Sequence, residues 1–418
     1  MRRAASSMFL TVVILAIVIR TPLAHTQDTW YGSEIVIMPD GSVYPETAPI
    51  TREGNVYTLT ADIVSCNKAI IVKKDGIILD GAGHIIQGVK EGTGIYVEDV
   101  SYVTIKNLVI SDFLYGIKLR NSSNNVITAV SFINCGLFVA ASHNNTVRST
   151  TVNGKPLVYM EDSSGIVSGE GVGQVILVDC HDVIVENVNI QNTTVGIEVY
   201  NSTNCIISNN VIKNDKCGIY LWLSNNMYVI NNTVENNDLG IILTRTNNSF
   251  IANNVIDRCN FAITLDLSSN NTICGNIIKD SRAWAMTIFK SSNNTIYHNN
   301  FINNSGLVNS GISSANKWDN GYPSGGNYWS DYKGEDKDSD GIGDTPYTVV
   351  YFELCPDKVD RYPLMEPVTE PETVPTPAIS TPTPTPEEEG ISTGVLVGII
   401  VVVLVIAAIG AFIAIRRR

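Results

Sequence analysis

Apolar and polar residues alternate along the middle of this chain in units of about 22 residues. Each unit opens with a small residue and then places apolar residues at every second position, as in Gly196-Ile197, Gly218-Ile219 and Gly240-Ile241. Alternation with a period of two is typical of β-strands and sends one set of side chains inward. Short strand patterns that repeat at this spacing, without a helical pattern, predict a β-solenoid whose coils stack on one another.

Asparagine recurs at fixed positions in these units. One column lies eight residues after the openings, and a second lies fourteen after, at Asn210, Asn232, Asn254, Asn276 and Asn299. Amide side chains in register, about 4.8 Å apart, can donate and accept along a column. We therefore predict a buried structural asparagine ladder in the first column, at Asn204, Asn226, Asn248, Asn270 and Asn293. A buried column would exclude glycans from the sequons at Asn144, Asn270 and Asn293, and leaves Asn121 and Asn201 as better glycosylation sites.

The repeat breaks between Gly154 and Gly196. Strand-like alternation continues at 155–159 and 173–180, but Glu161 to Val172 contains glycine and serine in a pattern that predicts a protruding loop. Loops that leave a rigid scaffold often carry functional residues.

The two ends of the chain predict a membrane-tethered surface protein. Residues 1–26 combine early arginines, an apolar run and small residues, which indicates a signal peptide. Residues 366–392 are rich in Pro, Thr and Glu and predict an extended stalk, followed by an apolar span at 393–415 and the basic stub 416–418. Between them we expect an N-terminal cap at 27–65, coils at 66–305 and a C-terminal cap at 306–365. The expected location is the cell membrane, with a single span and the body outside the cell.

Three motifs carry a family resemblance, and they lie at 78–86, at 326–332 (Gly-Asn-Tyr-Trp-Ser-Asp-Tyr) and at 360–364 (Asp-Arg-Tyr-Pro-Leu). With the coils, they make the chain similar to the NosD-like, carbohydrate-binding and sugar-hydrolase (CASH) family of right-handed parallel β-helix proteins. The whole layout resembles an archaeal cell-surface version of that family. The resemblance implies an all-β, right-handed parallel β-helix with a small C-terminal cap. It does not fix the chemistry, because this scaffold carries lyases, hydrolases, binding modules and a copper-delivery accessory protein.

The amino-acid composition excludes some classes of binding partner. A net charge of −13 and a pI near 4.8 argue against nucleic acid as a partner. The eight cysteines do not share columns on neighbouring coils, so the sequence predicts small buried residues rather than a disulfide framework, with Cys66, Cys180 and Cys355 undecided.

A paired-carboxylate active site has one candidate. Glu235 and Asp257 occupy the same column on successive coils, at a separation that a retaining glycosidase could use. Lys213 and Lys279 flank them in that column, so we interpret the four residues as cross-strand ion pairs and the two acids as weak catalytic candidates.

Carbohydrate binding has a broader basis. Aromatic side chains project from one predicted face, and flat aromatic rings stack on pyranose rings while neighbouring polar groups bind hydroxyls. The predicted carbohydrate-binding residues are Tyr200, Tyr220, Trp222, Asp266 and Phe289. A loop or a neighbouring chain that covers these aromatics is an equally good interpretation.

The sequence contains candidate ligands for calcium but not for copper. Residues 336–344 place oxygen donors as in a calcium loop, with a glycine at the sixth position and Tyr347 where an EF-hand has glutamate. We predict structural calcium at Asp336, Asp338, Asp340, Ile342 and Asp344. Copper is not supported, since His84, His143, His181 and His298 are scattered over different coils and methionine forms no cluster.

The sequence thus favours a membrane-anchored, extracellular β-helix protein that binds polysaccharide or an envelope glycoprotein without catalysis. A polysaccharide lyase or glycoside hydrolase on the same scaffold is the first alternative, and a periplasmic copper-binding accessory protein is the second. The ligand, the glycosylated sequons and the oligomeric state stay open.

Overall fold

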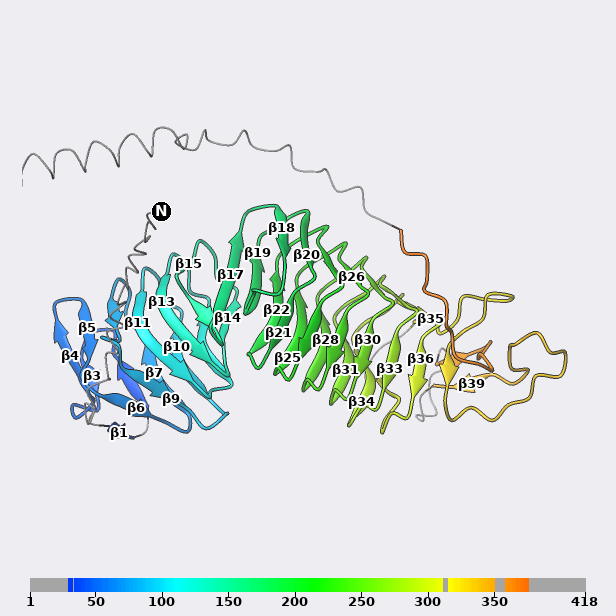
Figure 1. The fold of residues 1–418 in the computed structure, drawn as a ribbon, viewed down its shortest axis with the longest axis horizontal. Helices are drawn as coiled ribbons and strands as arrows, with labels where there is room; N and C mark the ends of the chain where they lie inside the picture. The colour runs from blue at the N-terminus through cyan, green and yellow to red at the C-terminus, as the bar shows by residue number, and fades with distance from the viewer. Residues whose placement is uncertain (1–28, 33, 311–314, 350–357, 376–418) are drawn as a thin grey trace, which may run out of the picture.

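The computed structural model describes residues 29–32, 34–310, 315–349 and 358–375. They form a right-handed β-solenoid of about 12 turns, and no helix occurs among them (Figure 1). The predicted all-β class is confirmed. The predicted signal peptide and membrane span lie outside the described residues, and within those residues no helix has the length and apolar character needed to cross a bilayer.

The strands form five sheets. The largest contains β1 (Thr29–Tyr31), β4 (Ile50–Glu53), β5 (Val56–Leu59), β6 (Asp62–Val64), β8 (Ile78–Asp80), β9 (Ile85–Gln87), β11 (Thr104–Ser111), β13 (Val126–Ile133), β15 (Thr146–Arg148), β16 (Thr151–Val152), β17 (Lys155–Glu161), β19 (Gln174–Val178), β22 (Val195–Tyr200), β25 (Cys217–Trp222), β28 (Leu239–Thr244), β31 (Phe261–Asp266), β34 (Trp284–Phe289) and β37 (Val308–Ser310).

The second sheet contains β2 (Ile35–Ile37), β3 (Val43–Tyr44), β7 (Lys68–Val72), β10 (Thr93–Glu98), β12 (Tyr115–Arg120) and β14 (Leu137–Ala140). The third contains β18 (Gly165–Ser168), β20 (Val183–Glu186), β23 (Ile206–Ser208), β26 (Tyr228–Ile230), β29 (Phe250–Ala252), β32 (Thr272–Cys274) and β35 (Thr295–Tyr297). The fourth contains β21 (Asn189–Gln191), β24 (Val211–Lys213), β27 (Thr233–Glu235), β30 (Val255–Asp257), β33 (Ile277–Lys279), β36 (Asn300–Ile302) and β38 (Tyr328–Trp329). A small fifth sheet pairs β39 (Tyr347–Thr348) with β40 (Val359–Asp360).

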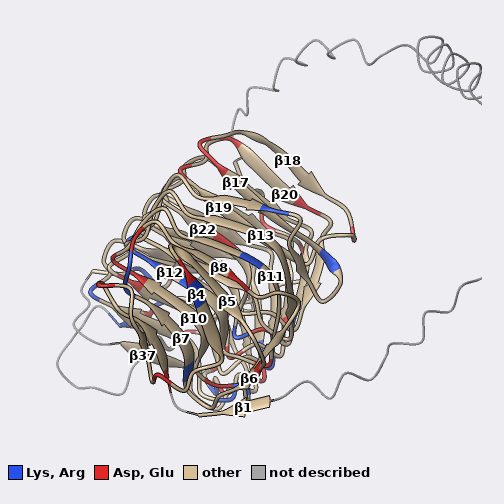
Figure 2. Ribbon diagram, turned by 90° about the vertical axis from the view of Figure 1, so that its left-hand side faces the viewer, with Lys and Arg blue, Asp and Glu red and all other residues tan. Residues whose placement is uncertain are grey.

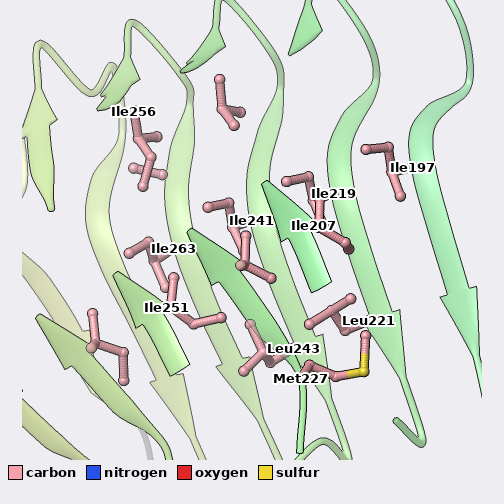
Figure 3. Close-up of a cluster of buried hydrophobic side chains, with 14 of the residues drawn as sticks. Ile197, Ile207, Ile219, Leu221, Met227, Ile241, Leu243, Ile251, Ile256 and Ile263 are labelled. Carbon is pink, nitrogen blue, oxygen red and sulfur yellow. The ribbon is translucent and has the colours of Figure 1, made fainter. Parts of the chain in front are cut away.

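The core consists of stacked aliphatic columns. Ile197, Ile219 and Ile241 pair in register on β22, β25 and β28, and each is fully buried (Figure 3). The small residue at each opening has a steric reason: a Cβ added at Gly218 would lie 2.7 Å from the carbonyl oxygen of Gly240 on the next coil. Acidic and basic residues are spread along the coils, as the ribbon of Figure 2 shows, and several acids, such as Glu198, Asp215 and Asp360, are buried.

The buried asparagine ladder lies in the second column rather than the first. Asn254, which is fully buried, accepts from the Asn232 backbone N–H and side chain at 2.9 Å and donates to Asn276 Oδ1 at 2.9 Å. The predicted first column is instead a row of turn residues with positive φ, and all its members except Asn204 are exposed. That prediction was wrong because asparagine has two roles at the corners of the coils. It adopts the left-handed turn conformation in one column and forms the hydrogen-bonded ladder in the other, and the sequence does not distinguish them.

This correction also changes the glycosylation argument. Asn144, Asn270 and Asn293 are exposed, as are Asn121 and Asn201. Burial therefore excludes a glycan at none of these five sequons.

The solenoid is divided into two stacks, which contradicts a uniform pitch along the chain. The N-terminal stack ends at β14, the last strand of the second sheet, and at β16. The C-terminal stack begins with β17, which pairs antiparallel with β16 and parallel with β19. The first strands of the C-terminal coils therefore continue the sheet of β11 and β13, and not the sheet of β12 and β14. We call the region where β14, β17, β19 and β22 meet the junction.

The segment predicted as a protruding loop is part of the junction. Within residues 161–172, strand β18 pairs in parallel with β20 and starts the third sheet. Serine and glycine on either side of this short strand indicated a turn. The strand itself contains only two apolar residues, too few to indicate a strand from the sequence.

The two C-terminal motifs close the stack. Asn327 Oδ1 accepts from the Asn299 side chain at 2.9 Å, and its backbone N–H donates to Asp360 Oδ2 at 2.7 Å. Trp329 stacks on Phe301 at 4.3 Å between centroids and donates from Nε1 to Asp360 at 2.9 Å. Burial raises the pKa of Asp360 to about 6, against the opposing effect of these hydrogen bonds.

The first residues of the predicted stalk lie against the coils. The Asn300 side chain forms two hydrogen bonds with the backbone of Val368, and the Asn253 side chain forms two with the backbone of Glu372. The Glu372 carboxylate also bonds His298 Nδ1 at 2.5 Å. The described residues of the predicted stalk therefore stay in contact with the coils as far as Glu372.

The cysteine prediction holds within the described residues. Seven cysteines are free thiols there, and all but Cys66 are buried, while Cys355 lies outside the described residues.

Candidate functional site

At the junction, side chains take the place of a missing strand beside β14. Gln174 accepts from Leu137 N–H at 3.1 Å and donates to Leu137 O at 2.7 Å, as a neighbouring peptide group would. Thr194 Oγ1 accepts from Gly136 N–H at 2.8 Å, and Glu198 Oε1 accepts from Val139 N–H at 3.1 Å. Four backbone groups of this edge, the N–H groups of Gly136, Leu137 and Val139 and the Leu137 carbonyl, are thereby satisfied without another coil.

These contacts change the predicted facial assignment. Glu198 and Tyr200 occupy positions expected to face outward, yet their exposed fractions are 1% and 6%. The outer face of β19 and β22 covers the end of the N-terminal stack, where Ile176, Val178 and Tyr200 join its hydrophobic core. Burial raises the pKa of Glu198 well above its ordinary value.

A row of aromatic rings runs along the junction, and we call it the aromatic row: Tyr115, Phe138, Tyr220, Trp222 and Tyr200. The ring centroids of Phe138 and Tyr220 are 6.2 Å apart, those of Tyr220 and Trp222 are 6.5 Å apart, and both pairs are parallel within 12°. The Tyr115 ring lies 5.2 Å from Phe138, and the Tyr200 ring 4.9 Å from Trp222. The row joins rings from both stacks.

A pocket of about 230 Å³ opens beside this row. Tyr115 and Phe138 line it from the N-terminal stack, and Tyr220, Ile242 and Thr244 line it from the C-terminal stack. Phe138 and Tyr220 are only half-buried, so their ring surfaces remain accessible. The pocket is largely apolar, with a few hydroxyl groups and Lys216 at its wall, and Lys216 is paired with Asp238 at 2.8 Å.

The structure brings together three of the five predicted carbohydrate-binding residues. Tyr220 and Trp222 lie side by side, and Tyr200 closes the row as a buried member. Asp266 and Phe289 lie on β31 and β34, two and three coils beyond Trp222 in the same register, and take no part in the row.

Lys118 lies over the N-terminal end of the row. Its Nζ is 4.7 Å from the Tyr115 ring centroid, 5.5 Å from that of Phe138 and 5.9 Å from that of Tyr96. Burial lowers the pKa of this ammonium, and repulsion from Arg120 adds to the effect.

A second polar group lies at the other end of the row. His143 Nδ1 is 2.5 Å from Asp179 Oδ2, and His143 Nε2 is 3.4 Å from the Tyr200 hydroxyl. The turn that carries His143 is held by Glu161, whose carboxylate accepts from the backbone N–H groups of Asn144 and Asn145. The histidine comes from the N-terminal stack, whereas both acids lie at the ends of the first strands of the C-terminal stack, Glu161 on β17 and Asp179 directly after β19.

The weak catalytic candidates form ion pairs, as the sequence predicted. Lys213 Nζ lies 2.8 Å from Glu235, and Lys279 Nζ lies 3.5 Å from Asp257. Arg258 bonds both acids. The hydrogen bond from Lys213 lowers the pKa of Glu235, which keeps this carboxylate ionised and paired.

The Asp-rich loop brings three of its carboxylates together. Oxygens of Asp336, Asp338 and Asp340 lie within 4.8 Å of one another, at the surface. Asp336 accepts from Gly341 N–H at 2.9 Å, while Asp344 accepts from Lys337 N–H at 2.9 Å. Ile342 is mostly buried and forms a bridge with Leu364.

Two family descriptions match the chain. Residues 55–172 match "Right handed beta helix region", and residues 159–334 match "Periplasmic copper-binding protein (NosD)". Together with the solenoid, these matches decide the family. The chain is a NosD-like right-handed parallel β-helix protein. The two matches meet at the junction.

Solved structures with the same fold are distant from this NosD-like chain. A mutant of the periplasmic alginate epimerase AlgG is 18% identical over 60% of this chain, with a TM-score of 0.30, and the match spans 64% of the epimerase chain. The A-module of the Azotobacter vinelandii mannuronan C-5 epimerase AlgE4 is 12% identical over 69% of this chain and 91% of its own, with a TM-score of 0.25. The Streptococcus pneumoniae surface protein and adhesin PfbA is 13% identical over 69% of this chain and 90% of its own, with a TM-score of 0.27. No curated protein matches the sequence.

The family description makes copper the metal to test against the residues of this NosD-like protein. Among the described residues, the group that combines a histidine with acids is His143, Glu161 and Asp179, and it contains no sulfur ligand. Cys180 is adjacent in sequence, but its thiol is buried and points at the Met160 carbonyl oxygen, 3.4 Å away. Because Cu(I) prefers thiolate and thioether ligands, these residues do not fit copper delivery.

Sequence reasoning missed several residues of this site in the NosD-like chain. Lys118 and Phe138 lie two residues after their openings at Gly116 and Gly136, the same position that Tyr220 has after Gly218. They precede the break, so a regular stack places them several coils away from Tyr220. The signal that could have found them is the interval of 60 residues between the openings at Gly136 and Gly196, which no whole number of regular 22-residue coils fills. Such a gap marks a place where two stacks can meet at an angle.

Proposed function

We propose that this protein binds carbohydrate at the aromatic row, as a non-catalytic receptor for polysaccharide or an envelope glycoprotein. The observation that carries the proposal is the near-parallel arrangement of Phe138, Tyr220 and Trp222 beside a pocket of about 230 Å³. Pyranose rings present apolar C–H faces, which aromatic faces bind, while hydroxyls such as that of Thr244 supply hydrogen bonds. Because the rings come from two stacks, they form a concave site rather than a flat wall.

Binding without hydrolysis is favoured by the absence of free acids at the pocket. None of the described residues that line it is a carboxylate. Hydrolysis of a glycosidic bond needs two carboxylates that flank it, about 5 to 9.5 Å apart. Glu198, the nearest acid in sequence to the row, uses its oxygens to bond Val139.

A lyase or hydrolase is the second candidate, and one observation favours it. His143 is oriented by Asp179 and lies beside Tyr200 at the end of the aromatic row. A histidine held by a carboxylate can transfer protons. Incubation of the full chain with polysaccharides would give new reducing ends or unsaturated products if this candidate is correct.

The location is also part of the proposal. An N-terminal signal peptide and a C-terminal apolar span at 393–415 would tether the solenoid outside the cell, in the cell membrane. Accessibility of the solenoid to protease in intact cells tests this placement.

We also propose that calcium orders the C-terminal cap through Asp336, Asp338, Asp340, Ile342 and Asp344. The convergence of three carboxylates supports this assignment. A rise in the unfolding temperature on addition of calcium, absent in Asp338→Asn, is the expected result. An unchanged unfolding temperature contradicts it.

The binding proposal is tested with a polysaccharide array and the full chain. Trp222→Ala should lower affinity at least tenfold, because it removes one stacking surface. Tyr228→Ala is the matched control, since Tyr228 stacks on Phe250 at 5.3 Å on a different sheet of the same coils. Equal losses in both variants, or no binding by the unaltered protein, would refute the proposal.

A further inference from the structure

We propose that the sugar bound at the aromatic row is a uronic acid, whose carboxylate pairs with Lys118. This inference rests on the proposed function and adds the chemical class of the ligand.

Among the described residues, Lys118 has no acidic partner, unlike four other lysines of the coils. Four lysines each have a carboxylate oxygen within 2.8 to 3.5 Å, supplied by the adjacent coil: Lys106, Lys213, Lys216 and Lys279. For Lys118, the positions on the two adjacent strands are occupied by Tyr96 and Phe138. The ammonium is thus placed among aromatic rings, without a carboxylate from either adjacent strand.

The acids nearest to Lys118 are already engaged. Glu98 bonds Arg120 at 3.0 Å, across the same pair of strands. Glu198 is fully buried, and both of its oxygens accept from Val139 N–H. Within the described part of the chain, no carboxylate lies within ion-pair distance of Lys118. A ligand anion would complete this site.

The ammonium is located where a stacked sugar would meet it. Tyr115 and Phe138 both line the pocket and both hold Lys118 against their ring faces. A sugar ring that stacks on Phe138 therefore lies beside the cation. The lysine is half-buried, so an ion pair formed here is less screened by water than one at an open surface.

A carboxylate suits this position better than other anions. In a uronic acid the carboxylate is attached directly to a ring carbon, so it enters with the stacked ring and needs little added space. Sulfate and phosphate esters carry their charge on a group joined through an exocyclic oxygen, so they extend farther from the ring and need more space beside it.

The test compares each polyuronate with its carboxyl-reduced, neutral form, using the full chain and calorimetry. We expect the charged form to bind about tenfold to a hundredfold more tightly, the range typical of a charge-assisted hydrogen bond. Lys118→Met should abolish this preference while leaving the weaker binding of the neutral form intact, and Lys118→Arg should keep it. Added salt should weaken the charged form alone.

Lys290→Met is the matched control. Lys290 also lies over a ring, 5.1 Å from the Phe289 centroid, but is exposed and distant in register from the row. It should leave both affinities unchanged. Neutral binding that depends on Trp222 but shows no charge preference would overturn the uronate assignment and leave the proposed function standing. Preference for a sulfated polysaccharide that contains no uronic acid, over every polyuronate, would also overturn the uronate assignment. Loss of all binding to the array would refute the proposed function itself.

Discussion

Each strand of the solenoid has backbone N–H and C=O groups that need hydrogen-bond partners on its next edge. The C-terminal coils and the junction supply these partners in different ways. In the coils, each strand is paired by the backbone of the next, and buried asparagines link the corners between coils. At the junction, the backbone of β14 is paired by the side chains of Gln174, Thr194 and Glu198.

The difference explains where a site can form. A coil that is followed by an identical coil presents a regular face, on which ion pairs such as Lys213 and Glu235 repeat at the surface. Where side chains end one stack, the next can start at an angle, and rings from both stacks converge. The aromatic row and the His143–Asp179 pair both occur at this place.

The largest expected effect is in the ladder of the coils. Asn254→Ala removes the acceptor for the backbone and side chain of Asn232, and the donor for Val229 O at 2.8 Å. It should lower the free energy of unfolding by about 4 kcal/mol, from unsatisfied groups and a cavity. The measurement is denaturant unfolding.

The control for the ladder is the exposed column. Asn248→Ala replaces a turn residue with a φ of 55° and should cost only about 1 kcal/mol. Equal costs at the two positions would show that the second column is no more structural than the first.

The junction gives the next largest effect. Gln174→Leu keeps the volume but leaves Leu137 N–H and O, and Val195 O, without a partner. We expect a loss of about 3 kcal/mol and faster hydrogen exchange at Leu137. Gln191→Leu, an exposed glutamine on β21, should change neither quantity. Unaltered exchange in Gln174→Leu would mean that the edge of β14 does not depend on this side chain.

The C-terminal cap differs from the coils and the junction because its contribution to the free energy of unfolding should depend on pH. The pKa of Asp360 is about 6, above its ordinary value of 3.8, so between these values the folded state holds a proton that the unfolded state has lost. Stability should therefore decline by about 2 to 3 kcal/mol as pH rises from about 4 to 6.

Asp360→Asn isolates this contribution, because Glu198 and Asp215 also have raised pKa values and act in the same direction. Unfolding free energies at pH 4 and pH 7 should differ less in the variant than in the unaltered protein. An identical difference would exclude Asp360 as the source.

The smallest effect concerns the acid column on the coils. Glu235→Gln breaks ion pairs with Lys213 and Arg258 and should cost about 0.5 to 1 kcal/mol at neutral pH. Because the pKa of Glu235 is lowered, this stabilisation disappears as pH falls through the lowered pKa, below 4.5. Glu335→Gln breaks a pair whose side chains are about three-quarters exposed and should cost nothing measurable. A loss of carbohydrate binding in Glu235→Gln would reopen a functional role for the column.

Much of the solenoid was predictable because its signal is local and repeated. The positions of Ile197, Ile219 and Ile241, and the ion pair between Lys213 and Glu235, follow from alternation and a spacing of 22 residues. The repeat does not show which of the two asparagine columns forms the ladder, since the same residue type occupies the turn column and the ladder column. Strand β18 was missed for a similar reason, because its flanking glycines and serines resemble a loop.

The candidate site could be predicted only in part. Tyr220 and Trp222 are neighbours within the repeat, so the sequence places them together. Phe138, Lys118 and His143 precede the break. Because the break does not fill a whole number of regular coils, the repeat does not predict which later residues these three contact.

The sequence by itself determined the stack: a small residue at each opening, aliphatic columns within, and polar corners. It did so because each coil repeats the contacts of the one before. Only the tertiary structure decided that the stack ends at β14 and resumes on another sheet, because that step depends on Gln174, Thr194 and Glu198 replacing a strand through contacts that occur once. The residues that meet at this non-repeated place, and so the site, follow from the angle between two stacks and not from the period of either.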